Sequence, residues 1–275
     1  MTSLPIADRS PGHNETPDDA SASIAGVRGD AIESELRRAL DQGEIEVRFQ
    51  PQFSCLSGAV IGAEALTRWR HPTLGMLGAR SLFAMADRVA LTTQLSQHVL
   101  GKALGEAACW PRELALSLNI SPQELSDPRF AIDFAALVAA HGVDPSRLTL
   151  EITEDLLLRD IDQASRALYS LRDVGLSAAL DDFGAGFCNF QYLRELPLDA
   201  LKLDKSMIAG VPSDSKSLAV LKAILALGRA LELEICAEGV EDADQLGTIT
   251  SEGCDYWQGF LGGQAMPGEA LLELT

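Results

Sequence analysis

Short apolar segments with β propensity alternate with longer helical segments along most of this chain of 275 residues. The β-prone segments are 45–53, 59–67, 114–119, 147–152, 177–182, 199–203, 233–238 and 254–257. The first two are separated by only a few residues around Gly58, so they are expected to pair as an antiparallel hairpin. The later segments are separated by helical sequence, and strands joined in this way run parallel. The pattern predicts an α/β fold: a TIM-type (β/α)8 barrel with one antiparallel strand.

Two of the intervening segments show a clear helical period. In 154–174 the apolar residues recur at steps of four and three residues: Leu157, Ile161, Ala164, Leu168 and Leu171. The segment 213–231 has leucines at helical spacing and begins with Ser213-Asp214, two residue types that cap helix N-termini. Each of these segments is therefore predicted to be a helix that buries one stripe of its surface.

The first 28 residues differ in composition from the rest of the chain. They are rich in Ser, Pro, Asp and Gly and show no hydrophobic period, which predicts a disordered leader over 1–28. Residues 29–275 are uniform in texture and are predicted to form one barrel domain. With 47% hydrophobic residues, a domain of this length can bury a large core.

Composition also restricts the cellular setting and the partners. No apolar run of signal-peptide or membrane-spanning length occurs, and five scattered cysteines without a CxxC pair are typical of reduced thiols, so we expect a cytoplasmic protein. A net charge of −18 argues against binding to a nucleic-acid polymer, which requires a basic surface. It does not argue against a small phosphate-bearing ligand, because bound divalent cations reverse the local field.

The predicted strands end, one after another, in a polar side chain. These residues are Glu64, Asn119, Glu151, Asp181 with Asp182, Lys202 and Glu238, followed by Gln258 just past the last strand. One acid at a strand end is usually a turn or helix cap, but capping does not account for the whole series. Because the C-terminal ends of parallel barrel strands meet at one mouth, the series predicts a site there.

Carboxylate and amide oxygens dominate this predicted site. Such a ligand set favours magnesium, manganese or calcium over zinc or copper. The adjacent acids Asp181 and Asp182 can hold two cations when one carboxylate bridges them, an arrangement suited to hydrolysis at phosphorus. Lys202 lies between two leucines of a strand, so we interpret it as a cation of the site that orients or activates water rather than as a surface lysine.

Seven motifs occur in the order GAEALTRWRHP, LNISPQEL, LEITE, DDFGAG, LPLDALKLD, AEGVE and GCDYWQGF. They resemble the motifs of the EAL-domain cyclic di-GMP phosphodiesterase family, and the resemblance covers about residues 30–275. The resemblance implies an EAL-type barrel that hydrolyses cyclic di-GMP to linear pGpG with water activated by two Mg²⁺ or Mn²⁺ ions. It also implies that Ca²⁺ binds without supporting turnover.

The resemblance implies a role for each matched position. The implied metal ligands are Glu64, Asn119, Glu151 and Asp181 for one ion, and Asp181, Asp182 and Glu238 for the other. The implied catalytic residues are Lys202, Glu238, Gln258 and Glu64, and the implied substrate-binding residues are Gln52, Arg68, Asp204 and Pro267. Glu154 is the implied anchor of the loop after Asp182. A homodimer is also implied, and a regulatory protein partner is compatible with it.

The sequence departs from the family pattern at several positions. These are Ala79, Ala185, Cys188, Asn189 and the pair Gln264-Ala265. They put loop regulation and guanine contacts in question, and they leave open an alternative in which the barrel binds cyclic di-GMP as a receptor module without turnover. A second alternative, an enolase-like barrel lyase, explains acids at strand ends but not Arg68 or the ordered motifs.

Overall fold

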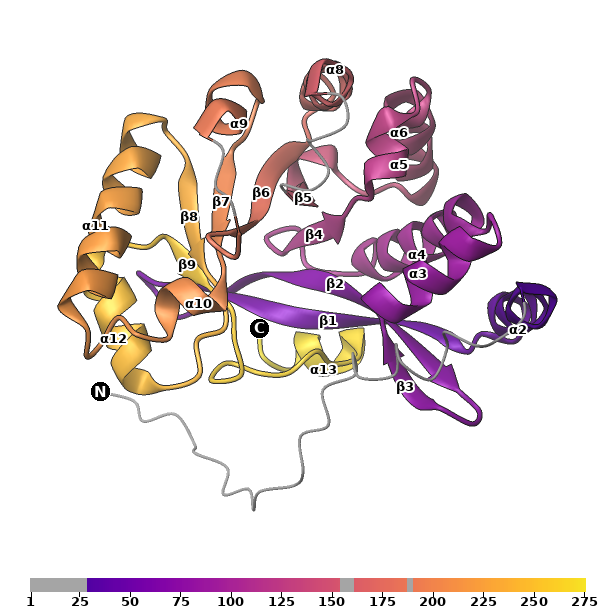
Figure 1. The fold of residues 1–275 in the computed structure, drawn as a ribbon, viewed down its shortest axis with the longest axis horizontal. Helices are drawn as coiled ribbons and strands as arrows, with labels where there is room; N and C mark the ends of the chain where they lie inside the picture. Colours follow the sequence, from indigo (N-terminus) through magenta and orange to yellow (C-terminus); the bar gives the residue numbers. More distant parts are fainter. Residues whose placement is uncertain (1–28, 154–160, 187–189) are drawn as a thin grey trace. The chain divides into compact units, whose positions relative to one another are not determined.

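The computed structural model describes residues 29–153, 161–186 and 190–275 (Figure 1). These residues divide into two compact units: the first comprises 29–45 and 68–92, and the second comprises 46–67, 93–153, 161–186 and 190–275. The predicted leader 1–28 lies outside the described residues, so the leader and the domain bounds drawn from it stay predictions.

The second unit contains a closed barrel of parallel strands with one reversed strand. The strands are β1 (Ile45–Ser54), β2 (Val60–His71), β4 (Ala115–Asn119), β5 (Leu148–Thr153), β6 (Ser177–Phe183), β7 (Ala200–Leu203), β8 (Glu234–Ala237) and β9 (Tyr256–Trp257). They pair in the order β1-β9-β8-β7-β6-β5-β4-β2, and β1 also pairs with β2 and closes the ring. The pairs from β2 to β9 are parallel, whereas β1 is antiparallel to β9. The predicted TIM-type barrel with one antiparallel strand is confirmed.

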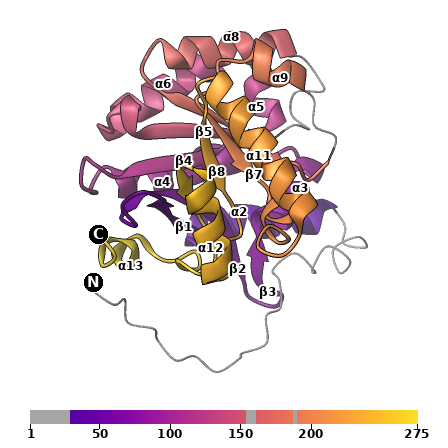
Figure 2. The same cartoon turned by 90° about the vertical axis from the view of Figure 1, so that its left-hand side faces the viewer.

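Helices connect the parallel strands, and one more helix, α13 (Gly268–Leu272), follows the last strand. The connecting helices are α4 (Thr92–Ala107), α5 (Pro122–Ser126), α6 (Phe130–His141), α8 (Ile161–Arg172), α9 (Phe190–Glu195), α10 (Lys205–Ile208), α11 (Ser215–Ala230) and α12 (Ala243–Glu252), with a 3-10 turn at Pro145–Arg147. Figures 1 and 2 show α11 on the outer side of the strands, where it contacts β8. None of the helices in the described residues has the length and apolar character needed to cross a bilayer.

The two predicted helices form, and their buried stripes contain most of the expected residues; Ile161 is only half-buried. α11 buries Leu221, Ile224, Leu225 and Gly228, which lie at helical spacing. α8 buries Ala164, Ala167, Leu168 and Leu171. The described part of this second helix starts at Ile161, and residues 154–160 of the predicted helix lie outside the described residues.

The first unit contains a short hairpin that the sequence analysis did not predict. The unit consists of α2 (Gly29–Gln42), the end of β2, β3 (Gly75–Gly78) and α3 (Ala79–Arg88), and the hairpin is formed by β2 and β3. β2 continues to His71 instead of ending at residue 67, and its last residues pair antiparallel with β3. The turn is closed by the His71 ring, whose Nδ1 accepts hydrogen bonds from the backbone N–H groups of Thr73 and Leu74 at 3.2 and 3.1 Å. The sequence does carry turn residues here, Pro72 and Gly75, and Gly75 has φ +76°, but the predicted strand ended at residue 67 and these signals were not used.

The extension of β2 corrects the predicted position of Glu64. The residue lies in the middle of β2 and not at its end. It lies close to the end of the parallel pairing with β4, which runs from Gly62 to Ala65. Among the strands predicted to end in a polar side chain, β2 therefore contributes its acid, Glu64, from the middle of the strand.

Asp214 should stabilise the protein through the N-terminus of α11. Its carboxylate accepts hydrogen bonds from the backbone N–H groups of Lys216 and Ser217 at 3.2 and 2.9 Å. Asp214→Ala is expected to lower the free energy of unfolding, seen as a lower urea midpoint, because two backbone N–H groups of the first helical turn lose their acceptor. Urea denaturation measures it, and Ser213→Ala, at the exposed residue before the cap, is the matched control. Equal stability of the two variants would contradict the capping role.

Candidate active site at the mouth of the barrel

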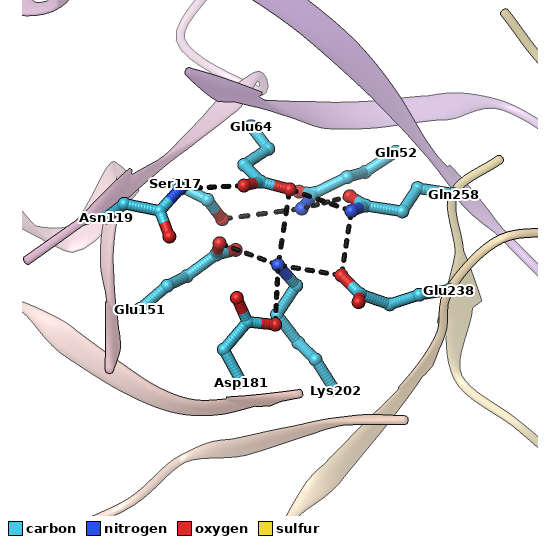
Figure 3. A network of polar contacts seen from close by, with 9 residues as sticks. All are labelled: Gln52, Glu64, Ser117, Asn119, Glu151, Asp181, Lys202, Glu238 and Gln258. Carbon is cyan, nitrogen blue, oxygen red and sulfur yellow. Dashed lines mark hydrogen bonds and ion pairs between the residues drawn. The ribbon is translucent and has the colours of Figure 1, made fainter. Parts of the chain in front are cut away.

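The ammonium group of Lys202 lies at the centre of four carboxylates (Figure 3). Its Nζ is 2.6 Å from Glu151, 2.8 Å from Glu238, 3.1 Å from Asp181 and 3.2 Å from Glu64. The lysine is completely buried, and Glu151 is 1% exposed. Side chains from five different strands or strand ends therefore meet at one point, as the sequence pattern predicted.

Strand geometry explains why these side chains meet. Successive residues of a strand point to opposite faces, so the buried leucines that flank Lys202 in β7 face away from the carboxylates. The register places Asn119 of β4 beside Glu151 of β5, and Glu64 of β2 beside Ser117 of β4. Parallel pairing thus brings equivalent ends of neighbouring strands to the same rim of the barrel.

Amide side chains hold the carboxylates in place. Asn119 Nδ2 donates to Glu64 Oε1 at 2.7 Å. Gln258 Nε2 donates to both Glu64 Oε2 and Glu238 Oε1, at 2.7 and 2.8 Å. The oxygen of Gln258 accepts from Gln52 Nε2 at 3.1 Å, which turns the amide nitrogen of Gln258 toward the acids.

Ser117 is a residue of this network that the sequence analysis missed. Its Oγ accepts a hydrogen bond from Gln52 Nε2 at 3.4 Å, and the side chain is buried. Ser117 precedes Asn119 by two residues in the same strand, so both side chains lie on the same face. That period of two was the available signal, but a serine in an apolar strand has no charge that would mark it as a site residue.

Burial and mutual repulsion oppose ionisation of three acids. Burial, reinforced by Glu64, raises the pKa of Glu151 well above its ordinary value. Burial also raises the pKa of Glu238 to about 8, with repulsion from Asp181 as a further cause. The pKa of Asp182 is raised by burial and by the neighbouring Asp181. The cluster therefore has more negative charge than its surroundings stabilise.

Lys202 is the internal counter-ion of this cluster. Burial alone would lower its pKa, but Asp181 and Glu151, with the other acids, raise the pKa well above its ordinary value. For Glu64 burial acts to raise the pKa, and Lys202 together with a hydrogen bond from Gln258 outweighs burial and lowers it. Lys202 is thus fixed as an ammonium ion, and Glu64 as a carboxylate.

The residues present fit divalent cations. The cluster consists of five carboxylates and one ammonium group: Glu64, Glu151, Asp181, Asp182, Glu238 and Lys202. Five negative charges against one positive charge leave a formal excess of four, which two divalent cations would balance. Carboxylate oxygens of Asp181, Asp182 and Glu238 lie within 4.8 Å of one another. In addition, Oε1 of Glu151 is buried and accepts no hydrogen bond within the described residues. Hard cations such as Mg²⁺ prefer such oxygen donors.

Three of the predicted substrate-binding residues, Asp204, Pro267 and Arg68, belong to different elements of the structure. Asp204 follows β7 and accepts a hydrogen bond from the Ser206 N–H at the start of α10. Pro267 precedes α13. Arg68 pairs with Gly78 in the hairpin of the first unit. The structure gives these residues local structural roles, and their contacts to substrate stay predictions.

Some predicted positions lie outside the described residues. These are the loop anchor Glu154 and the departures Cys188 and Asn189. Ala185 is described, and its N–H donates to the carbonyl oxygen of Asp182 at 3.1 Å. Gln264 is exposed, and the neighbouring Ala265 is half-buried.

Relatives of this chain are known from several bacteria. Uncharacterized protein y4lL of Sinorhizobium fredii is 39% identical over 239 residues, which cover 87% of this chain and 29% of that protein. The cyclic di-GMP phosphodiesterase NbdA of Pseudomonas aeruginosa is 35% identical over 246 residues, which cover 88% of this chain and 31% of that protein. The chain therefore spans about a third of the length of these curated relatives.

A solved structure and a family model also match this chain. The PaMucR phosphodiesterase, solved as a complex with c-di-GMP, matches with a TM-score of 0.82 and 34% identity, over 88% of this chain and 100% of that one. The model of the EAL domain family matches residues 33–265, which include every residue of the acid, amide and lysine cluster. The chain belongs to the EAL domain family.

Proposed function

We propose that this chain hydrolyses cyclic di-GMP to linear pGpG with the help of two divalent cations. The observation that carries the proposal is the Lys202 ammonium group, buried among four carboxylates at the mouth of the barrel. A relative and a structural neighbour named as phosphodiesterases support the substrate class. In the reaction, water adds to phosphorus, one P–O3′ bond breaks, and the 3′-oxygen leaves with a proton.

Two groups of ligands are proposed for the cations. Glu64, Asn119, Glu151 and Asp181 would hold one ion, and Asp181, Asp182 and Glu238 would hold the other. Bound Mg²⁺ or Mn²⁺ would supply positive charge that offsets the negative charge of the phosphate under attack. Asp181 belongs to both groups, so its position matters for both ions.

The chain's own donors prepare this site. Lys202 contacts four acids at once, which fixes their orientation, and its ammonium group is a hydrogen-bond donor for the attacking water. Gln258 bridges Glu64 and Glu238, and Gln52 holds Gln258 in the required orientation. Because these donors are already in place, little reorganisation is needed when the reaction begins.

The remaining roles concern the substrate and the assembly. We propose that Gln52, Arg68, Asp204 and Pro267 contact the dinucleotide, with Arg68 suited to its phosphate as a guanidinium group. We also propose Glu154 as the anchor of the loop after Asp182, and a homodimer as the assembly. A regulatory protein partner fits the same picture.

Hydrolysis is expected to depend entirely on added Mg²⁺ or Mn²⁺. The purified chain is incubated with cyclic di-GMP in either metal or in EDTA, and products are separated by chromatography against a pGpG standard. Ca²⁺ is expected to support binding, measured by calorimetry, without product. Absence of pGpG in both metals rejects the enzymatic proposal, and binding without turnover in every metal would identify a receptor module instead.

A further inference from the structure

Asp181 and Asp182 are consecutive residues of β6, yet their carboxylates belong to the same cluster. Oxygens of both acids and of Glu238 lie within 4.8 Å of one another. In a regular strand, successive side chains point to opposite faces of the sheet. Asp182 would then face the helices that surround the barrel, away from Asp181. The alternation must be interrupted at this point of β6.

The pairing of β6 with β7 shows the interruption. Leu180 pairs with Leu201 and Phe183 pairs with Leu203, so β6 uses three steps where β7 uses two. One extra residue is therefore inserted in β6, which is a β-bulge. Because the two leucines of β7 share a face, Leu180 and Phe183 also share a face. Asp181 and Asp182 therefore both lie between the two paired residues of β6, where β7 has the single residue Lys202.

The backbone around the bulge has an unusual conformation. Asp182 has φ +57°, in the left-handed region that Asp tolerates better than most residues. Its carbonyl oxygen accepts a hydrogen bond from the Ala185 N–H at 3.1 Å, which closes a tight turn. Within that turn Gly184 has φ +99°, and a Cβ at Gly184 would lie 2.6 Å from Cγ and Sδ of Met207 in α10. This φ favours glycine over any residue with a Cβ, and the Met207 side chain is the neighbour that would have to shift to admit one.

We propose that Gly184, packed against Met207, is the positioning residue that fixes the bulge and so turns Asp182 toward the second cation. This inference rests on the proposed function, because it concerns the second of the two proposed ions. Gly184 touches no reacting atom in this scheme. It acts through the backbone of Asp182, whose carboxylate would otherwise be directed away from Asp181 and Glu238.

The test measures Mn²⁺ binding by the full chain without substrate, using calorimetry and the EPR signal of free Mn²⁺. Gly184→Ala is expected to weaken one of two binding events about 10- to 100-fold and to leave the other within about threefold, because the ligands themselves stay intact. Asp182→Asn, which keeps a residue tolerant of left-handed φ but removes the charge, is expected to show the same pattern. Gly186→Ala is the matched control, since a Cβ there meets no described atom within 4 Å, and both binding events should persist.

The possible results separate this inference from the proposed function. If the natural chain binds two ions and a folded Gly184→Ala variant binds both with unchanged affinity, the positioning role is overturned while the proposed function stands. If the natural chain binds fewer than two ions, the two-cation mechanism and this inference fail together. If Gly184→Ala does not fold, Met207→Phe takes its place, because it enlarges the side chain that already fills the space beside Gly184. The same weakening of one site is then expected, and unchanged affinities overturn the inference.

Discussion

Replacing Asp181 by asparagine is expected to reduce kcat/KM for cyclic di-GMP by about 10³-fold or more, which corresponds to about 4 kcal/mol of transition-state stabilisation. Asp181 is the acid shared by the two proposed cation sites, so one substitution weakens both. Asparagine has nearly the same shape, and the fold should therefore be retained. Steady-state kinetics in Mg²⁺ measures the loss of activity, and thermal unfolding checks that the protein is folded.

The matched control for this substitution is Asp173→Asn. Asp173 is exposed, follows α8 and lies outside the acid cluster, so its loss removes the same charge without touching the site. The control should keep kcat/KM within about twofold, as is usual for surface substitutions. An Asp181→Asn variant that retains activity within tenfold of the natural chain would show that Asp181 is not a ligand shared by two catalytic cations.

Lys202→Met is expected to have the largest effect on stability in EDTA. The lysine is completely buried and contacts four carboxylates, so methionine leaves a cluster of buried negative charges without its counter-ion. Breaking a buried ion pair by removing one partner costs about 3–5 kcal/mol. Urea denaturation in EDTA measures the loss, with Lys216→Met, at an exposed position of α11, as the control. Turnover should fall sharply in the same variant because the proposed hydrogen-bond donor for the attacking water is removed.

The stability deficit of Lys202→Met should depend on pH and on divalent ions. Burial raises the pKa of Glu151 and of Glu238, and for both acids Lys202 opposes that increase. Without the lysine, both acids are protonated more easily in the folded state. An acid with a raised folded-state pKa loses stability as the pH rises through that pKa. Glu238 has a pKa of about 8 with the lysine present, so its contribution to the deficit should grow as the pH rises above about 8. Mg²⁺ should reduce the deficit by replacing the missing positive charge. A deficit that changes with neither pH nor Mg²⁺ would indicate a packing effect alone.

Local sequence patterns determined most of the elements of this protein and the membership of its site. Alternating strand and helix segments predicted the barrel, and helical spacing predicted the buried stripes of α8 and α11. The sequence offered Ser213 and Asp214 as adjacent candidates for the N-cap of α11, and the structure uses Asp214. Lys202 was recognisable because a charged residue between two strand leucines must find partners inside the protein. These features are readable because each depends on residues only a few positions apart.

The tertiary structure decided how these side chains meet. That one ammonium group serves four carboxylates, and that Ser117 joins the network through Gln52, depends on strands far apart in the sequence. That the His71 ring closes the turn after β2 likewise depends on side-chain geometry, although Pro72 and Gly75 mark a turn in the sequence. The bulge in β6 is the strongest case, since it exists only in the register between β6 and β7. Strand alternation read from the sequence sends consecutive aspartates to opposite faces, and only the pairing with a neighbouring strand reveals the extra residue that brings them together.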